Sequence, residues 1–410
     1  MFSSRLPRDL SPSPFFAELE CVKADAKKAA AAGGLPFIDM TVSSPLRVGL
    51  PFDLQPAVDA ARAEFGTWVA DAAGRRDARE AVAEYYRERG GWFDAEQIIL
   101  TASTSEAYSI LFKAFCDPGD VVLTPMPGYP LLDTLAQLEH LECAPYFLKL
   151  KREKKKGIPA SAGMTNKGAD TSFRFVLDSD SLLAAPERAK ILLLVSPHNP
   201  TGHCVSREEW NEAVRFCEEN NLILVVDEVF GDYVFSDKVQ RSWKYVTNES
   251  GPKCPIFWLN GLSKAVGSPQ LKLGWMAFYA PEDKFEDIRA ALEFVADAYL
   301  SVSAPAQALA RPMLAASMPY ESAIRERLLA NWKTLREAFP SKYCPDVLGG
   351  WYAVVRLGDD DEEITLRLLR EKHVLVQPGF FFDFDEDGWV VVSLLQEPAL
   401  FKEAIERIKQ

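Results

Sequence analysis

From about residue 97 to residue 298, short apolar runs alternate with longer stretches in which apolar residues recur at helical spacing. The short runs have the length of buried strands, and the longer stretches have the pattern of one-sided helices. The predicted strands are Ile98–Thr101, Val121–Thr124, Ile191–Val195, Leu222–Val226, Ile256–Leu259 and Leu273–Tyr279. The predicted helices are Glu106–Phe115, Leu131–Leu138, Glu208–Asn220 and Lys284–Ala298. This alternation predicts an α/β fold with a mostly parallel sheet between helices.

The two ends of the chain have a different pattern. Residues 1–46 predict an irregular arm with one helix, and beyond residue 300 helices and short strands no longer alternate regularly. The elements predicted there are helices over Phe15–Ala32 and Met318–Phe339 and strands over Trp351–Leu357 and Trp389–Leu395. We therefore expect a large domain over residues 47–292 and a smaller α+β domain that combines residues 1–46 with residues 293–410.

One segment, Lys151–Asp170, interrupts the alternation. It begins with several lysines and continues with small and polar residues. A basic binding patch is one interpretation. Because the segment contains little that can pack into a core, we predict instead a solvated surface loop inserted between two elements.

Charge and composition narrow the range of partners. The chain has 46 lysines and arginines against 59 aspartates and glutamates, a formal net charge of −13, which argues against a nucleic acid or an acidic membrane as partner. No apolar run approaches the ~20 residues of a membrane helix, and residues 1–16 lack the pattern of a secretory signal. The seven cysteines, with no Cys-x-x-Cys pair, are typical of free thiols in a reducing cytoplasm. The four histidines lack the spacing of metal ligands, so we expect no metal.

Polar and aromatic side chains follow the predicted strands, at the ends where α/β sheets bind ligands. After the first strand, Ser103, Thr104 and Ser105 open a helix, where free backbone N–H groups and the positive end of the helix dipole favour a phosphate. A simple helix cap explains the same residues. After the second strand, Tyr129 lies in a Pro-Gly-Tyr-Pro turn that presents its ring at the strand end.

The next three strands are followed by an amide, a carboxylate and a lysine. Asn199 lies in a turn, Ser196–Gly202, that two prolines and a glycine hold in place. Asp227 ends a fully apolar strand, and a carboxylate there is costly to bury unless it meets a cation. Lys264 follows the next strand in a turn of small residues, and a lysine that loses its solvation can give up its proton and form a Schiff base with an aldehyde. An ordinary turn with two solvated lysines, Lys264 and Lys272, is the alternative.

These groups occur in a fixed order along the chain: phosphate cradle, aromatic ring, amide, carboxylate and lysine. Together they resemble the class I/II aminotransferase family, the fold-type I enzymes that depend on pyridoxal phosphate (PLP). The resemblance covers nearly the whole chain, and its Ser-Pro-x-Asn-Pro-Thr-Gly, Asp-Glu-Val and Ser-Lys motifs are specific in combination. It implies a fold-type I PLP-dependent transferase with a large domain, a smaller α+β domain and a homodimeric assembly.

The resemblance implies a role for each candidate residue. Lys264 would hold PLP as an internal aldimine and shuttle the proton, and Asp227 would pair with the pyridinium nitrogen, which makes the ring an electron sink. Asn199 would donate to the phenolic oxygen of PLP, and Tyr129 would stack on the ring. Trp68 falls where relatives place a tyrosine that reaches the cofactor of the partner subunit. The residues implied in phosphate binding are Ser103, Thr104, Ser105 and Lys272.

The sequence departs from the family pattern at three cofactor positions. Lys272 stands where many relatives have an arginine, and it lacks the bidentate fork of a guanidinium. Gly261 replaces a common phosphate-contacting serine or threonine. Phe230 replaces a tyrosine that donates a hydrogen bond to the phenolic oxygen of PLP.

The substrate site differs more. Val390–Ser393 fall where relatives carry the arginine that binds the substrate α-carboxylate, and valines cannot replace it. By family position, the loop with Ser43 and Arg47 lies over the substrate, so Arg47 is the predicted carboxylate ligand and Ser43 assists it. Two alternatives stay open: Arg47 is a solvated surface arginine, or the substrate is an amine without an α-carboxylate.

The implied reaction moves an amino group between an amino acid, or an amine, and a 2-oxo acid. A PLP lyase that eliminates a β- or γ-substituent would use the same cofactor residues. A PLP-binding regulator is the third interpretation, but such proteins carry a DNA-binding domain in front, and residues 1–46 are too short and irregular for one. The expected partners are a small-molecule amino donor and a 2-oxo acid acceptor, and the expected enzyme is a cytoplasmic homodimer.

Overall fold

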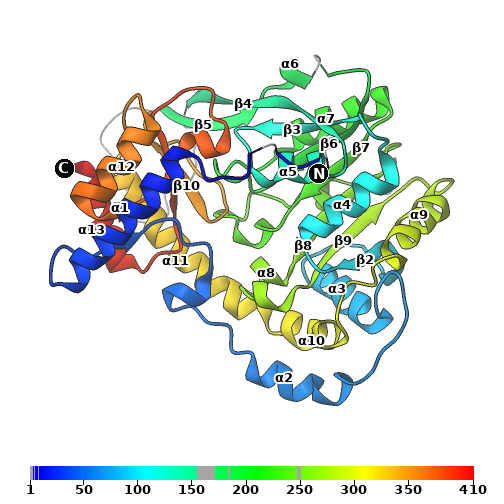
Figure 1. Cartoon of the computed structure of the whole chain (residues 1–410). Coiled ribbons are helices and arrows are strands. Elements are labelled where there is room, and N and C mark those ends of the chain that lie inside the picture. The colour runs from blue at the N-terminus through cyan, green and yellow to red at the C-terminus, as the bar shows by residue number, and fades with distance from the viewer. Residues whose placement is uncertain (1–2, 4, 8, 155–170, 183–184, 247–250) are drawn as a thin grey trace.

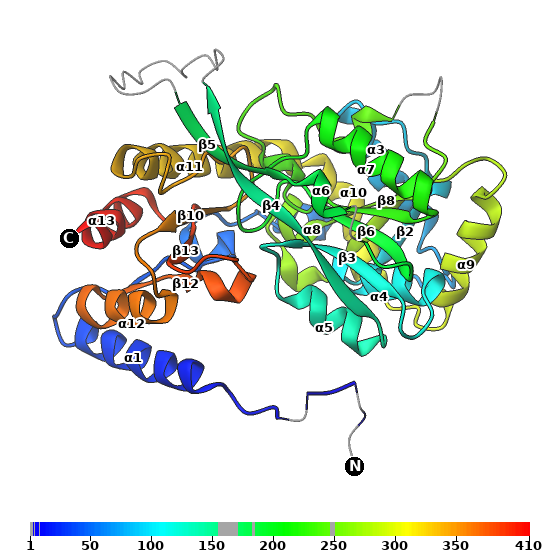
Figure 2. The same ribbon diagram turned by 90° about the horizontal axis from the view of Figure 1, so that it is seen from above.

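A large central sheet organises the molecule. The computed structural model describes residues 3, 5–7, 9–154, 171–182, 185–246 and 251–410, and it is drawn from two directions in Figures 1 and 2. In these residues the sheet has eight strands in the order β2-β9-β8-β7-β6-β3-β4-β5. The strands are β2 (Ile98–Thr101), β3 (Val121–Met126), β4 (Glu142–Lys154), β5 (Thr171–Leu177), β6 (Ala189–Val195), β7 (Ile223–Asp227), β8 (Ile256–Gly261) and β9 (Gly274–Tyr279).

The sheet is mostly parallel, as predicted. Strands β4, β3, β6, β7 and β8 pair in parallel with one another, whereas β5 and β9 run antiparallel to their neighbours. Because β9 is antiparallel to both β8 and β2, strand β2 runs in the same direction as β8. The carboxyl ends of β2, β3, β6, β7 and β8 therefore lie at one edge of the sheet, where open α/β sheets bind ligands.

Helices cover both faces of the sheet, which explains the nearly continuous apolar strands. Along β7, Val225 packs into the core on one face, and Leu224 and Val226 pack into the core on the other. The first face is covered by α4 (Thr104–Phe115), α5 (Leu131–Leu138) and α9 (Phe285–Asp297). The other is covered by α3 (Arg76–Glu88) and α7 (Arg207–Asn220). Short helices α6 (Ser179–Leu182) and α8 (Leu262–Ala265) lie in the connections.

A smaller group of elements gathers at one end of the molecule (Figure 2). Its antiparallel sheet has the order β10-β13-β12, and β1 pairs in parallel with β11. The strands are β1 (Ile38–Asp39), β10 (Tyr352–Arg356), β11 (Val374–Leu375), β12 (Gln377–Pro378) and β13 (Trp389–Ser393), and the helices are α1 (Pro14–Ala31), α11 (Ser317–Ala338), α12 (Asp361–Lys372) and α13 (Pro398–Lys409). The pairing of β1 with β11 joins the N-terminal arm to the C-terminal part of the chain.

The exact domain boundaries, residues 47–292 for the large domain and residues 1–46 with 293–410 for the smaller one, remain a prediction. Helix α10 (Ala304–Ala315) lies beyond the predicted boundary and packs against α3 and against α2 (Gln55–Ala61). Helix α11 follows it and packs against α13. The chain thus passes from the large sheet to the smaller group along α10 and α11.

The surface loop predicted over Lys151–Asp170 is wrong at its start. Lys151–Lys154 are the last residues of β4, which pairs with β5 from Leu148 to Lys154. Residues 155–170 lie outside the described residues. Leu148–Lys151 alternates apolar and charged residues as a strand does, but the all-charged run Lys151–Lys154 has no such alternation and was interpreted as a loop.

Three further features of the described residues concern membrane spans, metal ligands and cysteines. No helix among them has the length and apolar character of a membrane span. They contain no group of three or more histidine, cysteine, aspartate or glutamate side chains arranged to hold a metal ion. The seven cysteines are free thiols, and Cys204, Cys217, Cys254 and Cys344 are buried.

Candidate active site

Three predicted residues meet at the carboxyl edge of the large sheet. Asp227 is the last residue of β7, and Lys264 lies in α8 directly after β8, the neighbouring strand. Asn199 follows β6, the neighbour of β7 on its other side. The parallel register of β6, β7 and β8 therefore brings the amide, the carboxylate and the lysine to one place.

The Asp227 carboxylate is held by two hydrogen bonds. The Tyr108 hydroxyl, on α4, donates to Oδ2 at 2.7 Å, and the backbone N–H of Val229 donates to Oδ1 at 3.0 Å. Burial raises the pKa of Asp227 above its usual value, and the two hydrogen bonds offset only part of this effect. An ionised carboxylate in this position is most stable against a cation. Tyr108 was not among the predicted residues, and it comes from a helix 119 positions away in sequence.

The Lys264 amine lies in an aromatic environment. Its Nζ is 4.7 Å from the centre of the Trp351 ring and 5.4 Å from that of Phe230. Burial lowers the pKa of Lys264 to about 8, while the negative charge of Asp227 acts in the opposite direction. Near neutral pH, a much larger fraction of this amine is unprotonated than in an ordinary lysine. A neutral amine is the form that attacks an aldehyde and accepts a proton.

The aromatic side of the site is shared between the two parts of the molecule. Phe230 follows β7, whereas Trp351 directly precedes β10 and Tyr352 is its first residue. The ring centres of Trp351 and Tyr352 are 5.3 Å and 6.0 Å from that of Phe230. Tyr129, at the end of β3, has a 46% exposed side chain. Partial burial, and then the charge of Asp227, raise the pKa of Tyr129, which places it within electrostatic reach of the carboxylate. Trp351 and Tyr352 were missed because only the tight Gly349-Gly350 turn marks them in the sequence.

Asn199 carries an unsatisfied polar atom. Its amide oxygen is buried and has no hydrogen-bond partner in the described structure. A buried polar atom without a partner costs about 1–3 kcal/mol. The amide is thus positioned for a ligand that can complete its hydrogen bonding.

At the N-terminus of α4, where phosphate binding is predicted, the Glu106 carboxylate accepts a hydrogen bond from the backbone N–H of Ala102 at 2.6 Å. The Ser103 hydroxyl accepts a hydrogen bond from the Glu106 N–H at 3.2 Å, so this side chain caps the helix. The backbone N–H groups of Thr104 and Ser105 belong to the first turn of α4, where N–H groups have no carbonyl partner within the helix. A Cβ placed on Gly274 would lie 3.0 Å from the Ser103 carbonyl carbon and 3.2 Å from the Thr104 nitrogen. The start of β9 therefore lies against this loop.

Comparison with known proteins shows the family of this chain. Residues 60–408 match the family model described as aminotransferase class I and II. The chain belongs to the class I and II aminotransferase family. It is an enzyme of the aminotransferase type, and the predicted family membership is confirmed.

Named relatives agree with this membership. The aminotransferase is 27% identical over 352 residues to an alanine aminotransferase of Mycobacterium tuberculosis (strain ATCC 25618 / H37Rv), an alignment that covers 82% of this chain and 76% of the relative. It is 27% identical over 404 residues to an aspartate aminotransferase of Streptomyces avermitilis, an alignment that covers 94% of this chain and 92% of the relative. The structure of an alanine aminotransferase from Pyrococcus furiosus matches with a TM-score of 0.80 at 21% identity, over 97% of this chain and 98% of that one. The last match confirms the predicted fold-type I architecture.

Two departures from the family pattern have a structural setting in this aminotransferase. A Cβ on Gly261 would lie 2.9 Å from both the Gly274 Cα and the Leu273 carbonyl oxygen, so β8 and β9 leave no room for a serine or threonine. Lys272 has an exposed side chain and a left-handed backbone with φ of 52°. It lies two residues before Gly274, on the segment that leads to the N-terminus of α4. Its role in phosphate binding remains a prediction.

The predicted substrate residues are not gathered around Lys264 in the same way. The Arg47 side chain is 69% exposed, and its Nη2 lies 4.0 Å from Asp39 Oδ2. Ser43 lies beside the hydroxyl of Tyr352. Burial raises the pKa of Tyr352, and the hydrogen bond with Ser43 partly offsets this effect. Val390–Ser393 are buried within β13, and the Ser393 hydroxyl donates to the Val42 carbonyl. The roles of Ser43 and Arg47 remain predictions.

Trp68 lines a pocket beside the N-terminus of α4, since Ser301 of the same pocket donates its hydroxyl hydrogen to Glu106 Oε2 at 2.6 Å. The Trp68 side chain is 73% exposed, and it lines this shallow surface pocket together with Val69, Tyr299 and Leu300, which are also exposed. The predicted contact of Trp68 with a partner subunit is consistent with this exposure and remains a prediction.

Proposed function

We propose that this aminotransferase binds PLP on Lys264 and moves an amino group between an amino acid, or an amine, and a 2-oxo acid. PLP supplies, when bound, an electron-withdrawing ring that stabilises negative charge on the substrate Cα. One observation carries the proposal: Lys264, whose pKa is about 8, and the buried carboxylate of Asp227 lie at the ends of adjacent strands.

The residues of the site fit this cofactor. A protonated ring nitrogen would give the Asp227 carboxylate the cation that its burial requires. The Asn199 side-chain N–H would donate to the phenolic oxygen, and Tyr129 would cover the ring. The phosphate would lie at the N-terminus of α4, against Ser103, Thr104 and Ser105, with Lys272 supplying positive charge.

Lys264 also has the properties of the group that moves the proton. Its amine is neutral in a substantial fraction near neutral pH, so Nζ can accept a proton from the substrate Cα and give it back. The rings of Trp351 and Phe230 lie close to Nζ in this buried site, and the charge of Asp227 also acts on the amine. Because both rings are uncharged, they leave the amine free to change its protonation state.

The test is a screen of single amino acids and simple amines against the PLP-loaded enzyme. An active donor should convert bound PLP to pyridoxamine phosphate and release one equivalent of keto or aldehyde product without free ammonia. A 2-oxo acid should then restore PLP. Release of ammonia with a keto product, while PLP stays unchanged, would show the lyase reaction instead and would overturn the transfer.

A homodimer in the cytoplasm is part of the same proposal. Four exposed apolar side chains around one surface pocket, Trp68, Val69, Tyr299 and Leu300, support burial against a second copy of the chain. The free thiols support a reducing compartment. Sedimentation of the wild type and of Trp68→Ala tests the assembly: a dimer that Trp68→Ala weakens is expected, and a monomeric wild type would contradict it.

A further inference from the structure

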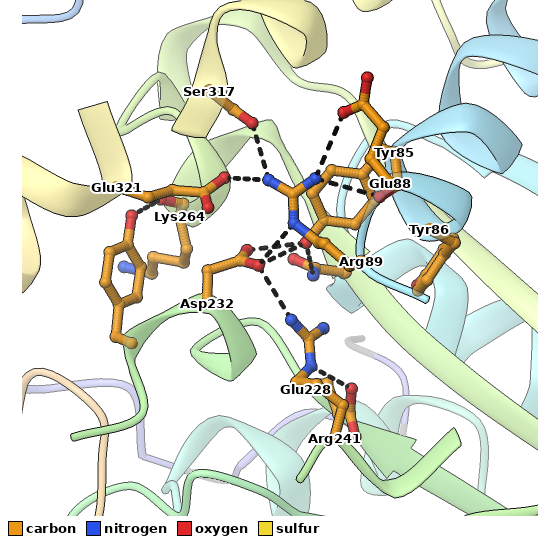
Figure 3. Close-up of polar contacts among 12 residues, drawn as sticks. Tyr85, Tyr86, Glu88, Arg89, Glu228, Asp232, Arg241, Lys264, Ser317 and Glu321 are labelled. Atoms are coloured by element: carbon orange, nitrogen blue, oxygen red, sulfur yellow. Dashed lines mark hydrogen bonds and ion pairs between the residues drawn. The ribbon is translucent and has the colours of Figure 1, made fainter. Parts of the chain in front are cut away.

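Behind Lys264 lies a buried cluster of charged side chains that the reaction described above does not use (Figure 3). At its centre, the Asp232 carboxylate accepts hydrogen bonds from the Tyr85 hydroxyl at 2.7 and 2.8 Å and from Arg241 Nη1 at 2.9 Å. Arg89 Nε lies 3.4 Å from the same carboxylate, and Arg89 Nη2 donates to Glu321 at 2.7 Å. The cluster therefore joins α3, η4 (Gly231–Tyr233) and α11.

Arg241 binds both ends of the turn that follows Asp227, from Glu228 to Asp232. Its Nε lies 2.7 Å from Glu228 Oε2, and its Nη1 binds Asp232 at 2.9 Å. A Cβ on Gly231 would lie 2.2 Å from Arg241 Cζ, so the guanidinium occupies the space beneath this glycine. Both ends of the turn from residue 228 to residue 232 are thus held by one rigid group.

Tyr233, the next residue, contacts the surroundings of Lys264 in two ways. Its hydroxyl donates to the Lys264 backbone carbonyl at 2.6 Å. Its ring centre is 5.3 Å from that of Trp351, and Trp351 is the ring nearest to Lys264 Nζ, at 4.7 Å. Tyr233 is fully buried. One side chain therefore holds both the backbone of the lysine and the surface on which its amine rests.

The composition of the cluster suggests precision of placement more than stability. Burying charged groups costs several kcal/mol each, and an apolar cluster of the same volume is often at least as stable. What ion pairs and their hydrogen bonds add is a fixed direction at each contact. The cluster is also tied to β8, because Asn260 Nδ2, four residues before Lys264, donates to the Tyr85 hydroxyl at 3.2 Å.

We propose that Tyr233 is a positioning residue for Lys264: its hydroxyl and ring hold the lysine turn and the Trp351 ring, and the cluster of Asp232, Arg89 and Arg241 holds Tyr233. The proposal rests on the proposed function of Lys264 as the PLP lysine. Without the Tyr233 hydroxyl, the Lys264 turn can shift and Nζ can leave the Trp351 ring for water. The amine then becomes easier to protonate, and it transfers the substrate proton more slowly.

The test is Tyr233→Phe, which removes the hydroxyl and keeps the ring. We expect kcat to fall roughly tenfold, the effect of about one lost hydrogen bond, with little change in KM. The second readout does not depend on turnover. In the full chain freed of PLP, the pH dependence of Lys264 acetylation, followed by peptide mass spectrometry, should move its midpoint upward from about 8.

The matched control is Tyr146→Phe. Tyr146 is also buried, and its hydroxyl donates to a backbone carbonyl, that of Leu193, at 2.8 Å. This variant should lose a similar amount of thermal stability while kcat and the acetylation midpoint of Lys264 stay at wild-type values. A second variant, Asp232→Asn, weakens the ion pairs of the residue that precedes Tyr233 and should shift the midpoint in the same direction.

Two results would overturn the proposal. In one, Tyr233→Phe keeps the wild-type kcat and midpoint; in the other, Tyr146→Phe changes both as much as Tyr233→Phe does, which would show a general loss of rigidity. Failure of the proposed function looks different: PLP would then not be found on Lys264 of the wild type after reduction. If PLP is on Lys264 and the midpoint of Tyr233→Phe does not move, the positioning role alone is wrong.

Discussion

The two sides of the active site are built in different ways. On the side of the large sheet, Asp227 and Lys264 follow adjacent strands, and Asn199 follows the strand beyond, so backbone register alone brings them together. On the other side, the groups come from distant segments: Trp351 directly precedes β10, and Arg47 lies in η1 (Pro45–Val48) of the N-terminal arm. The first side has buried, hydrogen-bonded polar groups, whereas the second offers aromatic rings and one exposed guanidinium.

This difference shows which part of the enzyme can vary. A group that is placed by sheet register stays in position when neighbouring side chains change, which suits a constant cofactor. The strand that would carry the carboxylate-binding arginine of relatives, Val390–Ser393, is instead fully buried in the core of the smaller sheet. We therefore predict that the donor is recognised from the arm or by the aromatic rings, and three changes can break or sharpen this contrast.

The largest effect is expected from Asp227→Ala on the sheet side. Breaking a buried ion pair costs about 3–5 kcal/mol, so removal of the substrate Cα proton should slow on the order of 10²–10³-fold. Tyr108→Phe is the graded control, because it keeps the carboxylate and removes only the hydrogen bond to Oδ2. Single-turnover absorbance measurements check both. An Asp227→Ala enzyme within a few-fold of wild type would contradict the pairing of Asp227 with the ring nitrogen.

A smaller and selective effect is expected from Arg47→Ala on the arm side. If Arg47 binds the substrate carboxylate, kcat/KM for the best amino acid should fall roughly ten- to a hundredfold, the effect of one charge-assisted hydrogen bond, while an amine is little affected. Arg62→Ala is the matched control, since Arg62 is also an exposed arginine, with a side chain 72% exposed and paired to Asp59. Equal small effects on acid and amine would remove Arg47 from the site.

The smallest change concerns Phe230, which lies between the two sides. Phe230→Tyr adds a hydroxyl that can donate to the phenolic oxygen of bound PLP and stabilise its negative charge. The pKa seen in the visible absorbance of the PLP-loaded enzyme should then fall, by about one unit or less. Spectral titration of wild type and variant measures the shift. An unchanged or raised pKa would show that residue 230 does not face that oxygen.

The part of the site that the sequence predicts is the part placed by the strands of the large sheet. Asp227, Asn199 and Lys264 could be placed at one edge of the sheet because each lies at the end of an apolar strand or shortly after one, and strand ends in a parallel sheet converge. The contacts of Tyr108 and Tyr233 could not, because they depend on how α4 and η4 pack against distant segments. The pairs Tyr108–Asp227 and Tyr233–Lys264 are 119 and 31 positions apart.

At two places, Ser103 and Lys151–Lys154, the local sequence fits more than one structure. Ser103 fits both a phosphate loop and a helix cap; its hydroxyl caps α4, and its role in phosphate binding remains a prediction. The strand character of Lys151–Lys154 was hidden because a strand that projects from the sheet carries charged residues. In both cases the local composition fits two structures; for Lys151–Lys154 the pairing with β5 decides between them.

The most direct test of the account is to locate the cofactor on the chain. The full-length enzyme is loaded with PLP, reduced with borohydride, digested and mapped by mass spectrometry. The account predicts PLP on Lys264, with a rate of capture that rises as the pH increases through about 8, because the neutral amine is the nucleophile. Lys272→Ala should still carry the label, and Lys264→Ala should have neither label nor turnover. PLP on Lys272, or a Lys264→Ala enzyme with wild-type turnover, would contradict the account.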